Sequence, residues 1–188
     1  MRFLDFKNKI PQNLFSFLDL LKIFAEENPS TIKTQLSRWN KKGWITKINR
    51  GLYCFDYSKI DELLLANILF PNSYLSAETV LHYYGLWPDI PFSVTSATAA
   101  APKKIINKAG SFFYFKIKPE LFFGYQSLKM ETGEFLKIAL PEKALLDYIY
   151  LKKIKSLKDL RLDLQKIDRR RYARYAKFFP LWVQRIKI

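Results

Sequence analysis

Residues 28–55 constrain the fold of this chain more than any other stretch, because signals for a helix, a stop and a hairpin follow one another there without a gap. The helix is predicted to begin at Pro29, with Ser30 as its N-cap, and to end at Gly43 after two lysines in the last turn. The apolar residues at i, i+4 and i+7 of this helix are Ile32, Leu36 and Trp39. They fall on one side, so the segment predicts an amphipathic helix with one buried face.

A short hairpin is predicted directly after Gly43. Two runs rich in β-branched and aromatic residues, 44–48 and 52–55, flank a turn that contains Gly51. Upstream, residues 17–24 carry apolar side chains at helical spacing and are expected to form a supporting helix. A helix pair followed at once by a hairpin is the element order of a winged helix-turn-helix, which places one helix in the major groove of DNA.

The outward side of the predicted helix has side chains of the kinds that bind DNA. No carboxylate occurs from Pro29 to Cys54, whereas hydroxyl and cationic side chains, which bond to base edges and phosphates, are frequent. The residues expected to contact DNA are Thr31, Lys33, Thr34, Ser37, Arg38 and Lys41 on the helix, and Lys47, Asn49 and Arg50 on the hairpin. The alternative is a solvated cationic surface without a partner.

Composition narrows the class of protein. The chain has 188 residues, 49% of them hydrophobic, which is enough for one large or two small domains with packed cores. A formal charge of +15 indicates a polyanionic partner, with nucleic acid favoured over a membrane. No stretch reaches the roughly 18 apolar residues of a membrane span, and no secretory signal is recognised, so a cytoplasmic protein is expected.

Few side chains are available for metal or nucleophilic chemistry. Cys54 is the single cysteine and His82 the single histidine, so neither an intrachain disulfide nor a cysteine-rich or histidine-rich metal site is expected. The six glycines are dispersed and form no phosphate-binding loop, which argues against nucleotide hydrolysis. We therefore expect no metal and no cofactor.

Residues 58–188 are predicted to form a second, mixed domain. The three strand-like runs in it are 92–97, 111–118 and 135–140. The small, basic stretch 98–110 is expected to be a loop, and helices are expected to begin after Ser76 and at Pro141. The expected fold class is α+β: a winged helix-turn-helix over residues 1–57, then a mixed α/β domain with a small sheet over 58–188.

A second basic cluster lies near the C-terminus. It follows Asp168, which is expected to cap the last basic helix, and consists of Arg169, Arg170, Arg171 and Arg174. Cations in a first helical turn are unfavourable by a few tenths of a kcal/mol each, so the cluster is a candidate anion-binding patch. The alternative is a solvated cationic face, with Tyr172, Ala176 and Phe179 turned inward.

Four stretches occur in a distinctive order: KKGWITKINRGLYCF (41–55), SAETVLHYYGLWPDIPFSVTSAT (76–98), FFYFKIKPELFFGY (112–125) and IALPEKALLDYIYL (138–151). Over roughly residues 15–155, the chain resembles the AbiEi family of type IV antitoxins of abortive-infection systems. The resemblance implies an N-terminal winged helix that represses the system's own promoter and a C-terminal α/β domain with antitoxin activity. It also implies a nucleotidyltransferase-like toxin as functional partner, without a stable complex between the two; direct contact stays open.

Two alternatives from other classes remain. A metal-dependent nuclease needs two or three acids and a lysine around a divalent ion, and the dense candidates are Glu131, Glu134, Lys137, Glu142, Lys143 and Asp147. Their spacing aligns poorly, and Lys143 and Asp147 are expected to form a surface ion pair. A protein-docking module would instead expose an aromatic patch made of Tyr114, Phe122, Phe123 and Tyr125. A non-catalytic DNA-binding repressor and antitoxin is the function we expect.

Overall fold

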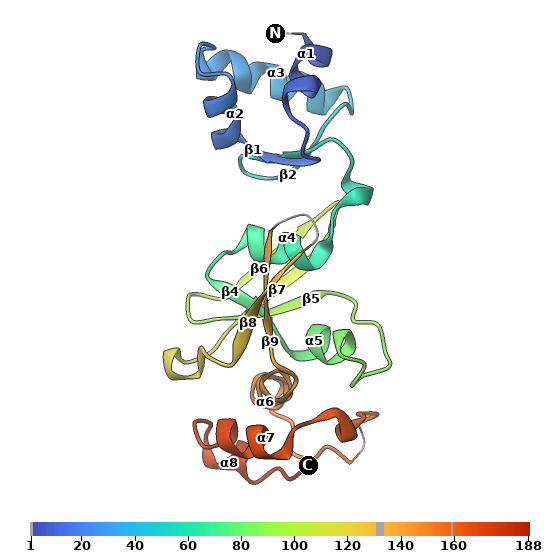
Figure 1. The fold of residues 1–188 in the computed structure, drawn as a ribbon, viewed down its shortest axis with the longest axis vertical. Helices are drawn as coiled ribbons and strands as arrows, with labels where there is room; N and C mark the ends of the chain where they lie inside the picture. The colour runs from blue at the N-terminus through green and yellow to red at the C-terminus, as the bar shows by residue number, and fades with distance from the viewer. Residues whose placement is uncertain (1, 131–133, 159) are drawn as a thin grey trace. The chain divides into compact units, whose positions relative to one another are not determined.

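The computed structural model describes residues 2–130, 134–158 and 160–188 (Figure 1). The chain divides into two compact units. Unit 1 contains the residues up to Asp61 and Asn107–Ala109, and unit 2 contains Glu62–Ile106 and Gly110–Ile188. The described residues form helices and two sheets, which confirms a mixed α+β fold. The predicted boundary after residue 57 falls a few residues before the observed division.

Unit 1 contains, among its described residues, a three-stranded antiparallel sheet and three α-helices, one before the first strand and two between the first and second strands. Its elements are α1 (Phe3–Lys9), β1 (Leu14–Ser16), α2 (Phe17–Ile23), α3 (Pro29–Lys41), β2 (Thr46–Asn49) and β3 (Leu52–Cys54). The strand order is β1-β3-β2, and Cys54 lies opposite both Leu14 and Thr46. The sequence did not indicate β1, because a strand of three residues that runs straight into a helix shows no alternation of its own.

The core of unit 1 is largely aromatic. Its buried members are Phe6, Ile10, Phe15, Leu20, Phe24, Ile32, Leu36, Trp39 and Ile45. The predicted apolar stripe of α3 is among them and is therefore confirmed. The ring of Phe6 in α1 lies 4.5 Å from the ring of Trp39 and 5.6 Å from that of Phe24, measured between centroids. Helix α1 thus covers the inner face of α3 and fixes which side of α3 stays in solvent.

Unit 2 is organised on a six-stranded mixed sheet with the order β6-β7-β5-β4-β9-β8. The strands are β4 (Ser73–Leu75), β5 (Val94–Thr98), β6 (Lys103–Asn107), β7 (Gly110–Lys116), β8 (Tyr125–Lys129) and β9 (Phe135–Ala139). The predicted small sheet is wrong, and so is the predicted loop at 98–110, which contains β6. Strand β6 is an edge strand with exposed lysines, and such edges carry charge in place of an apolar alternation.

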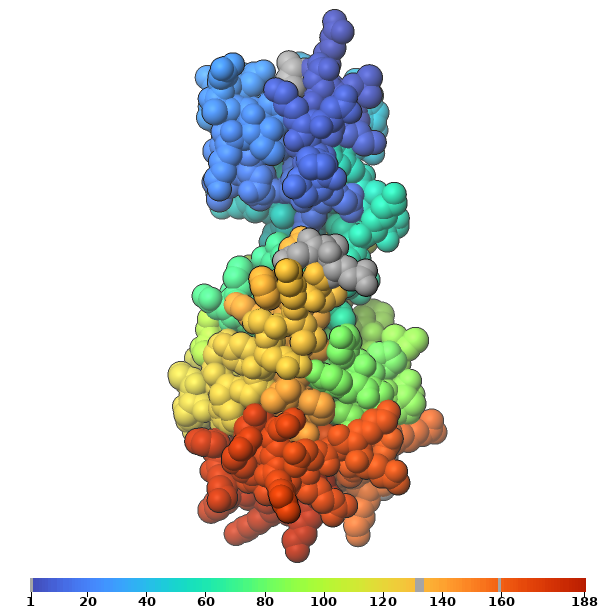
Figure 2. All heavy atoms as spheres, in the orientation of Figure 1, coloured from blue at the N-terminus to red at the C-terminus, as the bar shows by residue number. Residues whose placement is uncertain are grey.

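The helices of unit 2 are α4 (Glu62–Leu69), α5 (Ala77–Tyr83), α6 (Pro141–Lys152), α7 (Arg169–Ala176) and α8 (Leu181–Gln184). Single 3-10 turns occur in unit 2 at Pro119–Leu121 and Leu164–Lys166, and in unit 1 at Tyr57–Lys59. Helix α6 is enclosed: it contacts α5, α7, α8 and β9, and residues 142–149 are all buried. The C-terminal segment with α7 and α8, red in Figure 2, forms one end of unit 2. Helix α6 therefore lies between the sheet and this C-terminal layer.

Candidate nucleic-acid interface

Helix α3 holds most of the predicted contact residues, and local bonds fix both of its ends. The N-cap is Asn28 and not the predicted Ser30: the Asn28 Oδ1 accepts bonds from the backbone N–H of Ser30 at 2.9 Å and from its hydroxyl at 2.7 Å. Pro29 fills the first helical position, where no N–H is needed. The helix ends before Gly43, whose φ of +72° is the left-handed conformation that glycine adopts without strain.

The predicted contact residues of α3 all face solvent. They are Thr31, Lys33, Thr34, Ser37, Arg38 and Lys41. Two of them have local interactions that limit their roles. The Thr34 hydroxyl donates to the Ser30 carbonyl at 2.9 Å, which leaves it as an acceptor, and the Lys33 ammonium lies 5.2 Å from the centre of the Phe17 ring. The guanidinium of Arg38 and the ammonium of Lys41 remain directed to solvent.

The hairpin β2–β3 adds a second cationic edge to unit 1. Lys47 and Arg50 are exposed there, as expected. Asn49 is half-buried, and its side-chain oxygen accepts the N–H of Arg50 at 2.8 Å, so its role is to shape the turn. Gly51, with φ of +74°, completes the turn. Of the three predicted hairpin contacts, Lys47 and Arg50 are thus placed to meet a partner, and Asn49 supports them.

A bond that the sequence did not indicate ties the hairpin to α3. The side-chain oxygen of Asn40 accepts the backbone N–H of Lys47 at 2.9 Å. In addition, the Lys42 ammonium lies 4.7 Å from the centre of the Trp44 ring, and both residues are exposed. Asn40 and Lys42 therefore link the end of α3 to the hairpin region within the candidate interface. No local pattern predicts the Asn40 bond, because the two partners lie on different elements and meet only when the hairpin folds back.

The electrostatic character of this surface is uniformly positive. In the part of the chain that the structure describes, no ion pair involves Lys33, Arg38, Lys41, Lys42, Lys47 or Arg50. The carboxylate of Asp19, in α2, bonds within its own helix terminus. It closes a capping box with Ser16, whose hydroxyl donates at 2.6 Å, and this bond lowers the pKa of Asp19. The cations of α3 and the hairpin thus remain available to an anionic partner.

The second basic cluster is divided by its contacts. Asp168 caps α7 as predicted, accepting the N–H groups of Arg170 at 2.9 Å and Arg171 at 3.0 Å, and the bond from Arg171 contributes most to lowering the pKa of Asp168. The Arg171 guanidinium lies 3.3 Å from the buried carboxylate of Glu142. Arg174 lies over the Tyr175 ring at 5.5 Å. Arg171 therefore anchors α7 to α6, which leaves Arg169, Arg170 and Arg174 as the exposed part of the cluster.

The expected surface pair of Lys143 and Asp147 is wrong, because both side chains are 0% exposed. The Lys143 ammonium donates to Asp147 and, at 2.7 Å, to the Tyr74 hydroxyl. Asp147 also accepts the hydroxyls of Tyr74 at 2.9 Å and Ser76 at 2.7 Å. Burial lowers the pKa of Lys143 and raises that of Tyr74. This buried polar cluster joins β4 to α6, and no solvent reaches it.

The other acids and lysines considered for a nuclease site are dispersed. Glu134 is exposed, the Lys137 ammonium donates to the Pro71 carbonyl at 2.9 Å, and Glu142 accepts the N–H of Asp168 at 2.9 Å. Glu131 lies outside the described residues. Among the residues that the structure describes, no three His, Cys, Asp or Glu side chains come together as metal ligands. Within the same residues, no helix is long and apolar enough to cross a membrane.

The aromatic residues considered for a docking patch lie mostly in contact with one another and with the core. Tyr114 is 2% exposed, and its hydroxyl donates to the Ala66 carbonyl at 2.7 Å, so it cannot belong to an exposed patch. Phe122, Phe123 and Tyr125 are half-buried. The Tyr125 ring stacks on that of Tyr74 at 4.7 Å between centroids. The rings of Phe122, Phe123 and Tyr125 pack around the buried polar cluster, so the predicted patch lacks Tyr114 and has its other members only partly exposed.

The chain was compared with models of known protein families and with curated proteins, and neither comparison gives a match. The case for a function therefore rests on the residues and geometry described above.

Proposed function

We propose that this protein binds double-stranded DNA through a winged helix-turn-helix formed by residues 1–57. In this proposal α3 is the recognition helix, α2 its supporting helix and the β2–β3 hairpin the wing. The observation that carries it is the exposed face of α3, where hydroxyls and unpaired cations occur without a carboxylate and adjoin the cationic hairpin. A surface of this kind gains affinity for a polyanion by releasing counterions and can read base edges in the major groove.

The side chains divide into two roles. Arg38, Ser37 and Thr34 face outward from the middle of α3 and would meet base edges, with Arg38 able to bond to a guanine with two N–H groups. Thr31, Lys33 and Lys41, at the flanks and end of the helix, would contact phosphates. Lys47 and Arg50 on the wing, supported by Asn49 and by the Asn40 bond, would hold the adjacent backbone or minor groove.

The biological role that we propose is autorepression of the protein's own promoter combined with antitoxin activity. It rests on the resemblance to AbiEi antitoxins over roughly residues 15–155. In this role the protein is non-catalytic, acts in the cytoplasm where the DNA is, and needs no metal or cofactor. Its functional partner is a nucleotidyltransferase-like toxin. Co-purification with the product of the adjacent gene tests for direct contact, and the absence of a complex would assign neutralisation to repression or to reversal of the toxin's effect.

The first experiment compares binding of the full chain to its own upstream DNA and to a scrambled duplex of equal length, over a series of salt concentrations. We expect a preference of about a thousandfold or more for the upstream DNA, together with a salt slope that reports several phosphate contacts. Equal, weak and salt-sensitive binding to both duplexes would overturn the proposal, because it would reduce the +15 charge to a general affinity for polyanions.

A further inference from the structure

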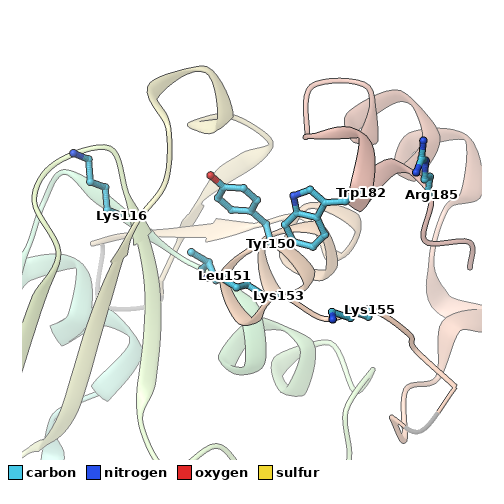
Figure 3. A pocket seen from close by; sticks show the side chains of 7 residues that line it. All are labelled: Lys116, Tyr150, Leu151, Lys153, Lys155, Trp182 and Arg185. Atoms are coloured by element: carbon cyan, nitrogen blue, oxygen red, sulfur yellow. The ribbon is translucent and has the colours of Figure 1, made fainter.

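Unit 2 contains a pocket that the proposed DNA-binding function does not use. Its volume is about 760 Å³, within the range of small-molecule and cofactor sites. Figure 3 shows that its walls come from the end of β7, from the C-terminal end of α6 with the loop that follows, and from α8. All of these elements lie in unit 2. The pocket is therefore independent of the face of α3 and of the hairpin.

The pocket walls combine cationic side chains with aromatic rings. The cations are Lys116, Lys153, Lys155 and Arg185, and the aromatic residues are Tyr150 and Trp182. Within the described residues, no acidic side chain lines the pocket and no carboxylate pairs with any of these four cations. A cavity with four unneutralised positive charges favours a ligand that carries several negative charges.

The aromatic side of the pocket is held in place. The rings of Tyr150 and Trp182 are nearly parallel, at an interplanar angle of 18° and a centroid distance of 6.2 Å. Tyr150 is fixed from behind by the buried Phe179, whose ring meets it edge-on at 5.9 Å. Trp182 is 40% exposed, so part of its ring remains accessible. A partly exposed indole beside cationic side chains provides a stacking surface for a flat, aromatic ligand.

From this combination we propose that the pocket binds a nucleoside phosphate, with its base stacked on Trp182 and its phosphates held by Lys153, Lys155 and Arg185. A nucleotide can make both kinds of interaction, since its base can stack on the indole and its negatively charged phosphates can pair with the cations. The chain has no glycine-rich phosphate loop, so in this proposal the side chains of the pocket hold the phosphates. The ligand is either a free nucleotide or the end of a single strand of nucleic acid, which share this chemistry.

The test measures binding of ATP, AMP, adenosine and pyrophosphate to the full chain by calorimetry, at about 0.1 M salt to screen the exposed cations of unit 1. We expect ATP to bind more tightly than AMP, because it carries more phosphate charge. We expect it to bind at least about tenfold more tightly than adenosine or pyrophosphate, because each of those contacts only one side of the pocket. A short single-stranded oligonucleotide identifies the source. Oligonucleotide binding that is tighter than ATP binding and is weakened by Trp182→Ala assigns a strand end, whereas tighter binding of ATP assigns a free nucleotide.

Two variants locate the site, each with a matched control. Trp182→Ala should weaken ATP binding about tenfold, whereas Leu181→Ala, on the same helix but outside the pocket, should not change it. Lys155→Glu should weaken it by about the same factor, and Lys177→Glu, the same charge change outside the pocket, should not. Lys155 and Lys177 are exposed, so both lysine variants should fold. The second comparison therefore tests the site even if Trp182→Ala does not fold.

Two results would overturn the proposal. If pyrophosphate binds as tightly as ATP and Trp182→Ala has no effect, the lysines only compensate the negative end of the α6 dipole and attract any anion. If neither ATP nor the oligonucleotide binds more tightly than about 1 mM, the pocket has no nucleotide ligand. Both results leave the binding of upstream DNA by α3 untouched, so the two proposals fail separately.

Discussion

Removing the carboxylate of Asp147 should destabilise unit 2 more than any surface change on the same helix. In Asp147→Ala, the buried Lys143 ammonium loses its counter-charge, and the hydroxyls of Tyr74 and Ser76 lose their acceptor. Breaking a buried ion pair by removing one partner costs about 3–5 kcal/mol. Lys143→Met should cost about 1–2 kcal/mol less than Asp147→Ala, since the carboxylate keeps two hydroxyl donors.

The effect should also depend on pH, with a sign that follows from burial. Burial lowers the pKa of Lys143 in the folded chain, and the loss of Asp147 removes the attraction that opposes this. Between the folded and the unfolded pKa of Lys143, the unfolded chain binds more protons, so the stability of Asp147→Ala rises with pH. Its deficit relative to the parent protein should shrink, by up to about 1.4 kcal/mol per pH unit, as pH rises from the pKa of Lys143 in the folded variant to its pKa in the folded parent.

The assay is equilibrium urea unfolding, read by hydrogen exchange of peptides from α6, which reports unit 2 separately from unit 1. The control is Lys152→Ala, also on α6, which breaks the partly exposed pair between Lys152 and Glu78 of α5 (2.7 Å) and should cost less than about 1 kcal/mol. If Asp147→Ala costs no more than Lys152→Ala, or if its deficit does not change with pH, then Lys143 is not held in a buried ion pair and the account of the cluster is wrong.

Three further predictions concern unit 1. Arg38→Ala should weaken binding to the upstream DNA by about 1–3 kcal/mol in a gel-shift titration, while the control Lys22→Ala on α2 should leave binding unchanged. Equal losses of binding free energy in the two variants would show that Arg38 contacts no base. In urea, Asn28→Ala should lower the free energy of unfolding by about 1 kcal/mol and Ser30→Ala by much less. If Ser30 were the N-cap, Ser30→Ala would cause the larger loss. Gly43→Ala should cost about 1 kcal/mol in the same assay because the backbone φ of Gly43 is positive, although the added methyl group meets no atom within 4 Å. An unchanged free energy of unfolding would contradict that backbone conformation.

Local signals in the sequence determined the part of the fold closest to the proposed interface. The i, i+4, i+7 spacing of Ile32, Leu36 and Trp39 fixes which side of α3 is buried, and Gly43 fixes where it ends. The exposed face, with Arg38 in it, follows from the same spacing. These features depend on residues a few positions apart, so the physics that sets them, helical periodicity and the freedom of glycine at positive φ, acts within the segment itself.

Two features depend on elements far apart in the chain and were decided by the tertiary structure: the burial of the Lys143–Asp147 pair and the pocket beside Trp182. The sequence places Lys143 and Asp147 one turn apart, but they are buried because β4 lies on one side of α6 and the C-terminal helices on the other. The pocket likewise exists only where α8 brings Trp182 beside Tyr150 of α6. A helical pattern records which residues share a face; burial and cavities arise from the surfaces that meet that face, and those surfaces come together only when the whole unit folds.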